Sequence, residues 1–306
     1  MQLRFNKTGH LLKSTFKVWY DRDPFRESAV IAYNAVFSLP GLLVLVITLS
    51  GYFFGADAVS GHLHNQVAQA MGNDTANQVQ EMVAAASKSK DSFWASIIGI
   101  ATILIGATGV FVQMQKSLNN IWEVKATAAK SGIAVFLKTR FFSFGLIVSI
   151  AFLLLISLLL SSLLSALDMW VQRHWSASFL VLFEILNFVF SLVVITLLFA
   201  MMFKILPDAK IKWNLVWIGA FVTSILFVIG KSALGLYFGK VNPGSGYGAA
   251  GSVILILLWA SYSSMIVFFG AEFTKVYSDY YFGEVKPSEN AVKQDSNTNL
   301  KVGTTH

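Results

Sequence analysis

Six long runs of apolar residues fill most of the chain, and shorter polar segments separate them. Each run reaches the roughly 20 residues that a helix needs to cross the hydrocarbon core of a bilayer. In hydrocarbon, backbone groups must be paired within the segment, which favours helices, and the runs lack the alternation of a transmembrane β-strand. The pattern therefore predicts an all-α, polytopic integral membrane protein with a six-helix domain over residues 30–282. The predicted spans are residues 30–54, 94–115, 141–166, 179–203, 214–238 and 251–276.

The basic residues lie almost entirely in every second gap between these runs. Of the 23 Lys and Arg residues, 18 lie before the first run, between the second and third, between the fourth and fifth, or at the end of the sixth and beyond it. Loops rich in Lys and Arg stay on the cytoplasmic side, so these segments and both termini are predicted to be cytoplasmic. The formal net charge of +7 then indicates loops that face anionic lipid headgroups rather than a surface for nucleic acid.

The segment before the first run, residues 1–29, is a basic arm. Leu12, Phe16 and Trp19 recur in it at helical spacing, with lysines off that face. Such an amphipathic helix tends to lie in the membrane interface. The alternative is a plain positively charged flank of the first span.

Two further segments lie outside the predicted spans. Residues 55–93 carry apolar positions at helical spacing on both sides of a break at 72–74, which predicts a short external helical hairpin. Residues 283–306 become polar and are predicted to form a disordered cytoplasmic tail.

Small and polar residues share faces of several predicted helices. Such faces let membrane helices pack closely, within one chain or in an oligomer, and the alternative is a polar internal path. Pro40 lies inside the first predicted helix and is expected to kink it. The aligned residues are Asn34, Ser38, Gly41 and Thr48 in the first helix, Gly99, Thr102, Gly106, Gly109 and Gln113 in the second, and Ser157, Ser161 and Ser165 in the third.

Ionisable residues at membrane depth are the candidate functional residues, because charge inside a bilayer is costly and rare. They are Glu184, with Asn187 on its face, Lys231 and Glu272. Glu184 and Lys231 are predicted to lie about 7–11 Å below the outer surface, at 1.5 Å per residue, and could form a buried pair. The alternatives are a position at the edge of the membrane for Glu184, snorkelling for Lys231 and a structural bond to a cytoplasmic Lys or Arg for Glu272.

Signatures of enzymes and of metal sites are missing. The chain has no Cys, which excludes disulfides and thiolate ligands. Of its five His residues only His62 and His64 are close in sequence, and neighbouring acids complete no recognisable ligand set. No phosphate-binding loop, nucleophile elbow or zinc-protease motif occurs. We therefore expect no catalytic residue, cofactor or metal, and no activity on nucleic acid.

Five segments form an ordered set of motifs: 32–40 with Tyr33, Ser38 and Pro40, 118–124 with Asn119 and Trp122, 203–208 with Pro207, 247–253 with Tyr247, Gly248, Gly251 and Ser252, and 270–274. Together they resemble the YihY/BrkB family of bacterial inner-membrane proteins. The resemblance covers about residues 20–282 and implies six helices and an inner-membrane location. The family has carried ribonuclease BN and virulence-factor labels, and its members have been linked to envelope lipid export. Phe203–Lys204 departs from the Tyr-Arg pair usual in the family.

The polar faces, the kinked first helix and the buried charges, together with the resemblance, favour a transporter. We expect a flippase-like protein for an amphipathic, anionic lipid or envelope precursor, with membrane lipids as partners. The main alternative is a non-transporting scaffold or assembly factor whose polar faces serve only helix packing. A channel for small ions or solutes is a third hypothesis.

Overall fold

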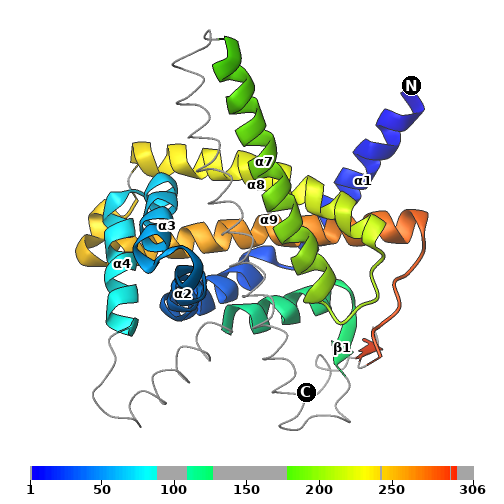
Figure 1. Cartoon of the computed structure of the whole chain (residues 1–306). Helices are drawn as coiled ribbons and strands as arrows, with labels where there is room; N and C mark the ends of the chain where they lie inside the picture. Colours follow the sequence, from blue (N-terminus) through cyan, green and yellow to red (C-terminus); the bar gives the residue numbers. More distant parts are fainter. Residues whose placement is uncertain (1, 88–108, 127–177, 242, 290, 295–306) are drawn as a thin grey trace, which may run out of the picture.

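The computed structural model describes residues 2–87, 109–126, 178–241, 243–289 and 291–294 (Figure 1). These residues are mostly helical, with residues 109–121 forming a further helix before β1. The elements in chain order are α1 (Gln2–Asp21), α2 (Pro24–Phe54), α3 (Ala56–Met71), α4 (Asn73–Ser87), β1 (Val124–Ala126), α7 (Ser178–Ile205), α8 (Trp213–Val241), the 3-10 helix η2 (Ser245–Ala250), α9 (Gly251–Tyr281) and β2 (Ala291–Lys293).

Four of the described helices are long and apolar enough to cross a membrane. The spanning segments are Pro24–Thr48 of α2, Phe188–Ile205 of α7, and the whole of α8 and α9. They correspond to the first, fourth, fifth and sixth predicted spans. The predicted third span and most of the second lie outside the described residues, so the count of six stays a prediction.

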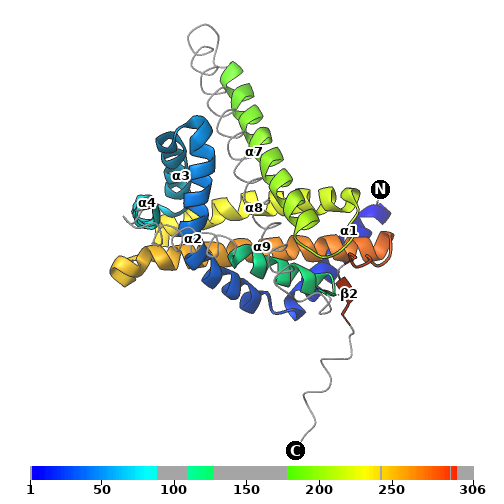
Figure 2. The ribbon, with the colours of Figure 1, turned by 60° about the horizontal axis from the view of Figure 1, so that its bottom comes forward.

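Helices α8 and α9 lie side by side and run in opposite directions (Figures 1 and 2). Two Gly–Thr contacts set their close approach. A Cβ atom at Gly219 would lie 1.8 Å from Thr274 Oγ1, and a Cβ atom at Gly270 would lie 1.8 Å from Thr223 Oγ1. Each Thr hydroxyl donates a 2.7 Å hydrogen bond to the Gly carbonyl one turn earlier in its own helix. The seam therefore excludes any larger side chain at either Gly without a shift of the helices.

The hairpin expected between residues 55 and 93 is present as α3 and α4. The two helices meet at Gly72, whose φ of 90° is a backbone conformation that Gly adopts readily. The hairpin packs beside α2 and near the beginning of α9, where the Ser252 hydroxyl donates to Gln78 Oε1 of α4. It thus lies at the opposite end of α9 from the N-terminus of the chain (Figure 1).

The segment after α9 differs from the prediction of a disordered tail. Strand β2 pairs antiparallel with β1, with Lys125 opposite Val292. Just before β2, the Lys210 N–H donates to the Lys286 carbonyl and the Ser288 N–H donates to the Asp208 carbonyl, both at 2.9 Å. The prediction is wrong here because backbone pairing with two loops orders even a polar segment. Residues 295–306 lie outside the described residues.

Candidate functional site

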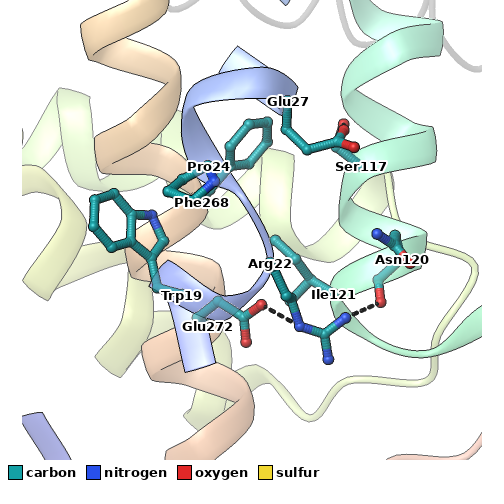
Figure 3. Close-up of a pocket in the computed structure, with 9 residues that line it drawn as sticks. All are labelled: Trp19, Arg22, Pro24, Glu27, Ser117, Asn120, Ile121, Phe268 and Glu272. Atoms are coloured by element: carbon teal, nitrogen blue, oxygen red, sulfur yellow. Dashed lines mark hydrogen bonds and ion pairs between the residues drawn. The ribbon is translucent and has the colours of Figure 1, made fainter. Parts of the chain in front are cut away.

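A small pocket lies where α1 ends and α2 begins, between residues 109–121 and α9 (Figure 3). Its volume of about 20 Å³ is room for roughly one water molecule. The lining residues are Trp19, Arg22, Pro24, Glu27, Ser117, Asn120, Ile121, Phe268 and Glu272. The pocket therefore brings together the predicted site residue Glu272 and segments that are far apart in the sequence.

Glu272 and Arg22 form the centre of the pocket. Arg22 Nε lies 2.8 Å from Glu272 Oε1, and the Glu272 side chain is only 1% exposed. The contact is an ion pair without an aligned hydrogen bond, and neither carboxylate oxygen of Glu272 accepts a hydrogen bond from a described residue. A buried carboxylate without hydrogen bonds is costly even when it is paired. Burial of the Glu272 carboxylate therefore destabilises this fold relative to a state in which the carboxylate is solvated.

The Arg22 guanidinium has two further partners on the other side of the pocket. Its Nη1 donates to the Asn120 carbonyl at 2.8 Å, and its Nη2 lies 2.8 Å from Glu123 Oε1. Glu123 in turn lies 3.5 Å from Lys275 Nζ. Charges of alternating sign thus connect the turn between α1 and α2, the turn before β1, and α9 through side chains.

The turn between α1 and α2 sets the position of Arg22. Asp23 adopts a left-handed conformation with φ of 53° and its side chain caps α2 by accepting from the Arg26 N–H. Pro24 follows in the first turn, where a missing N–H costs nothing. Trp19 fixes the other side, because its indole N–H donates to the Met265 carbonyl of α9 at 3.2 Å.

A second polar node joins two of the motif segments. Asn119 Nδ2 donates to Asp208 Oδ2 at 2.8 Å, and the Asp208 N–H donates to Asn119 Oδ1 at 2.7 Å. Pro207, next to Asp208, is buried, and Trp122 is 6% exposed in the adjoining core. Both side-chain functions of Asn119 are used, so this node holds the loop after α7 against residues 109–121.

Lys204, at the position where the sequence departs from the resemblance, has a structural partner. Its ammonium donates to the Ile211 carbonyl and lies 5.4 Å from the centre of the Trp213 ring. Phe203 beside it is 2% exposed. This pair therefore closes the turn between α7 and α8.

The predicted residues of α2 have local or packing contacts. Asn34 donates to the Val30 carbonyl of its own helix at 2.8 Å. Ser38 is buried and lies against Gly109, where a Cβ atom would come within 2.9 Å of the Ser38 hydroxyl. Tyr33 is 63% exposed, and the helix continues through Pro40. Of these residues Ser38 therefore makes a close packing contact, and the functional role of this face stays a prediction.

The motif at the beginning of α9 lies at the far end of the molecule from the pocket. Gly251 and Gly244 touch through their backbones, since a Cβ atom at Gly251 would lie 2.5 Å from the Gly244 carbonyl oxygen. Tyr247 is 61% exposed, and Gly248 lies within η2. With Ser252 bound to Gln78, this motif joins α9 to the α3–α4 hairpin.

The predicted pair of Glu184 and Lys231 stays a prediction. Glu184 and Asn187 lie in α7, but their side chains are outside the described set. Lys231 is half-buried in α8 and has no ion pair with a described carboxylate.

His62 and His64 lie on α3 of the hairpin. His64 Nε2 and Asn77 Oδ1 are 3.0 Å apart, and burial lowers the pKa of His62. In the described ranges, no group of three His, Asp or Glu residues is arranged to hold a metal ion.

Sequence reasoning identified Glu272 but not Arg22, Glu123 or Asp208. Two signals were present: Arg22 directly precedes the Asp23–Pro24 helix start, and Glu123 lies in a family motif. Both belong to segments predicted to lie on the same side of the membrane as the end of α9. The sequence pattern could therefore suggest a cytoplasmic Lys or Arg as the partner of Glu272, but it could not show which one.

Comparisons with known proteins place these observations in a family. The family model described as Virulence factor BrkB matches residues 15–295. A UPF0761 membrane protein of Saccharophagus degradans is 24% identical over 89% of this chain and 60% of its own length. Another, from Pseudoalteromonas atlantica, is 24% identical over 87% of this chain and 85% of its own length. YfkH of Bacillus subtilis, whose name describes it as ribonuclease-like, is 24% identical over 85% of this chain and 92% of its own length. No solved structure matches.

Proposed function

This chain belongs to the BrkB family of membrane proteins, and from that premise we propose that it is a flippase-like transporter for an amphipathic, anionic lipid or envelope precursor. The membership confirms the resemblance drawn from the motifs. The single observation that carries the proposal is the buried Glu272 carboxylate, which lacks a hydrogen bond from the described residues and faces Arg22. The chain spans only 60% of the Saccharophagus relative, and the activity is proposed for this chain alone.

The pocket supports transport because its charges can exchange partners. Ionisable groups within membrane helices commonly line substrate or ion pathways. Arg22 faces one buried carboxylate, one half-exposed carboxylate and one carbonyl. Conformational change needs contacts that differ between two states. An ion pair shared by the α1–α2 turn and α9 provides such a contact.

Arg22 also suits an anionic substrate. A guanidinium binds phosphate or carboxylate through two parallel hydrogen bonds and stays charged. Its Nη1 and Nη2 are held by the Asn120 carbonyl and by Glu123, whose side chain is 43% exposed. In the proposed cycle an anionic headgroup takes the place of Glu123, and the turn between α1 and α2 moves with Arg22.

A scaffold without transport is the second candidate function, and the seam between α8 and α9 favours it. The reciprocal Gly–Thr contacts at Gly219 and Gly270 hold two spans rigidly together. In this alternative the pocket is only a structural ion pair.

Lipid movement in vesicles separates the two functions. The purified chain is reconstituted into phosphatidylcholine vesicles that carry a trace of fluorescent phosphatidylglycerol, and a membrane-impermeant quencher reports the lipid on each side. We expect faster exchange than in protein-free vesicles, and a loss of at least tenfold for Arg22→Lys, which keeps the charge but not the planar fork. The control is Lys293→Gln, at an exposed ion pair with Glu284. Exchange no faster than in protein-free vesicles would favour the scaffold.

The orientation is part of the proposal. We propose six spans in the bacterial inner membrane with both termini in the cytoplasm, on the basis of the Lys and Arg distribution. An alkaline phosphatase fusion after Ala126 should then be inactive, because that enzyme folds only outside the cytoplasm. An active fusion would reverse the orientation and place the pocket outside.

We also propose that the chain is not a nuclease and binds no nucleic acid. The ribonuclease-like name belongs to YfkH, and this sequence has no metal or acid–base motif for hydrolysis. Purified protein with Mg²⁺ or Mn²⁺ should leave a labelled RNA intact. Metal-dependent cleavage that a single point mutation abolishes would overturn this.

A further inference from the structure

Helix α1 has one packed face and one free apolar face. Leu11 is 6% exposed and Thr15 is fully buried, whereas Leu12 is 43%, Phe16 56% and Tyr20 60% exposed. Residues three or four apart lie on the same side of a helix. The exposed three therefore form a continuous stripe, which we call the free face, beside the stripe that packs on the protein.

Positive charge borders the free face. Lys13 and Lys17 are exposed, and each follows a free-face residue by one position, about 100° around the helix. No acidic residue occurs in the chain before Asp21. Around its circumference α1 thus presents a packed stripe, an apolar stripe and a basic stripe.

The position of α1 places these stripes near a membrane surface. Both views show the N-terminus on the side of the molecule where α9 ends, and α1 leaves α9 obliquely (Figures 1 and 2). The anchoring contacts are the Trp19 bond to Met265 and the Arg22 pair with Glu272. Since α9 (Gly251–Tyr281) is a candidate span, a headgroup layer lies near its end. Helix α1 runs toward that level from its anchors at Met265 and Glu272, so its N-terminal part lies nearest to the headgroups.

We propose that the free face of α1 docks into the anionic headgroup layer of the membrane in which the chain is embedded. Leu12, Phe16 and Tyr20 insert beside the acyl chains, and Lys13 and Lys17 bind lipid phosphates. Aromatic side chains are favoured at this depth, and each Lys strengthens attachment to an anionic surface by about fivefold. Because the stripe of Lys13 and Lys17 is positively charged, the surface that the free face contacts is an anionic lipid surface. This inference does not depend on the transport proposal.

The test uses the absence of cysteine from the chain, because each engineered Cys then gives a single labelling site. A spin label is attached at Leu12→Cys or, as a matched control, at His10→Cys, an exposed position about 160° away around the helix. The variants are placed in nanodiscs of phosphatidylcholine with or without phosphatidylglycerol. Collisions with oxygen and with a water-soluble nickel complex report the depth of each label.

We expect the Leu12→Cys label to be shielded from nickel and accessible to oxygen in anionic nanodiscs, and the His10→Cys label to show the reverse. Replacing both Lys13 and Lys17 with Gln should lower the docked-to-undocked ratio by about 25-fold. High salt should have the same direction of effect.

Three results would overturn the proposal. Equal nickel access at the two labelled positions would mean that the free face is not docked. Equal shielding in purely zwitterionic nanodiscs would remove the role of anionic lipid. Spin–spin broadening that disappears on dilution with unlabelled protein would show that a second copy of the chain covers the face.

Discussion

Along α9, one stripe of side chains packs against α8 and another faces α1 and α2. The stripe toward α8 includes Gly270 and Thr274, and it is matched by Gly230 of α8, where a Cβ atom would lie 2.6 Å from Ile266 Cδ1. At Gly219 and Gly270 the facing Thr side chains leave no space for a Cβ atom, so a larger residue there requires the helices to shift. At Gly230 the end of the Ile266 side chain could move instead.

The stripe toward α1 and α2 is polar and uses contacts that can exchange. Ser261 Oγ lies 3.0 Å from Ser28 Oγ, the Met265 carbonyl accepts from Trp19, and Glu272 faces Arg22. Hydrogen bonds and ion pairs can pass to water, lipid or another side chain without repacking a core. The difference indicates a rigid pair, α8 and α9, against which α1 and the beginning of α2 can move.

The largest loss of stability is expected from removing the Arg22–Glu272 ion pair, on the side of α9 that faces α1 and α2. Arg22→Gln leaves Glu272 buried without its cation, which for a buried pair costs about 3–5 kcal/mol. Because Arg22 is 25% exposed, we expect the lower end of this range. Thermal unfolding in detergent measures the loss. The double variant Arg22→Met/Glu272→Met should recover most of it, and a double variant no more stable than the single one would contradict an ion pair as the cause.

An intermediate effect is expected on the rigid side. Gly219→Ala places a Cβ atom 1.8 Å from Thr274 Oγ1, and such overpacking typically costs about 1–3 kcal/mol. The double variant Gly219→Ala/Thr274→Ala should recover only part of the loss, because it removes Thr274 Oγ1 but keeps the Thr274 Cβ atom, 2.9 Å from the new Cβ atom. Gly235→Ala is the matched control on α8, since a Cβ atom there meets nothing within 4 Å. Equal thermal stability of the two Gly variants would show that the seam is not tight.

For the two faces of α9, the sequence indicates which kinds of contact to expect but not which residues contact one another. Apolar length predicted four helices within a few residues of their bounds, because crossing a bilayer constrains length and composition strongly. Small residues at helical spacing indicated close packing in the first three predicted helices, but no such prediction was made for the seam of α8 and α9, and nothing in one sequence pairs Gly219 with Thr274. Likewise, 250 residues of chain separate Arg22 from Glu272. The pairing of β2 with β1 was missed because each strand has only three residues, too few to show a pattern, and backbone hydrogen bonds do not depend on the side chains.

The smallest effect is expected from removing the uncharged hydrogen bond between Trp19 and the Met265 carbonyl, on the side of α9 that faces α1 and α2. Trp19→Phe removes the indole donor to the Met265 carbonyl but keeps an aromatic ring near Phe269, whose ring centre lies 5.9 Å from that of Trp19. A neutral hydrogen bond is worth about 0.5–1.5 kcal/mol, and the half-buried carbonyl can find water instead. Thermal unfolding should therefore change little, while amide hydrogen exchange in α1 should speed up by about threefold to tenfold, since local opening follows local free energy. Exchange in α8 should stay as it is in the unmodified chain. If α1 and α8 speed up together, the two sides of α9 open as one unit, and the division between a rigid and an exchangeable side is wrong.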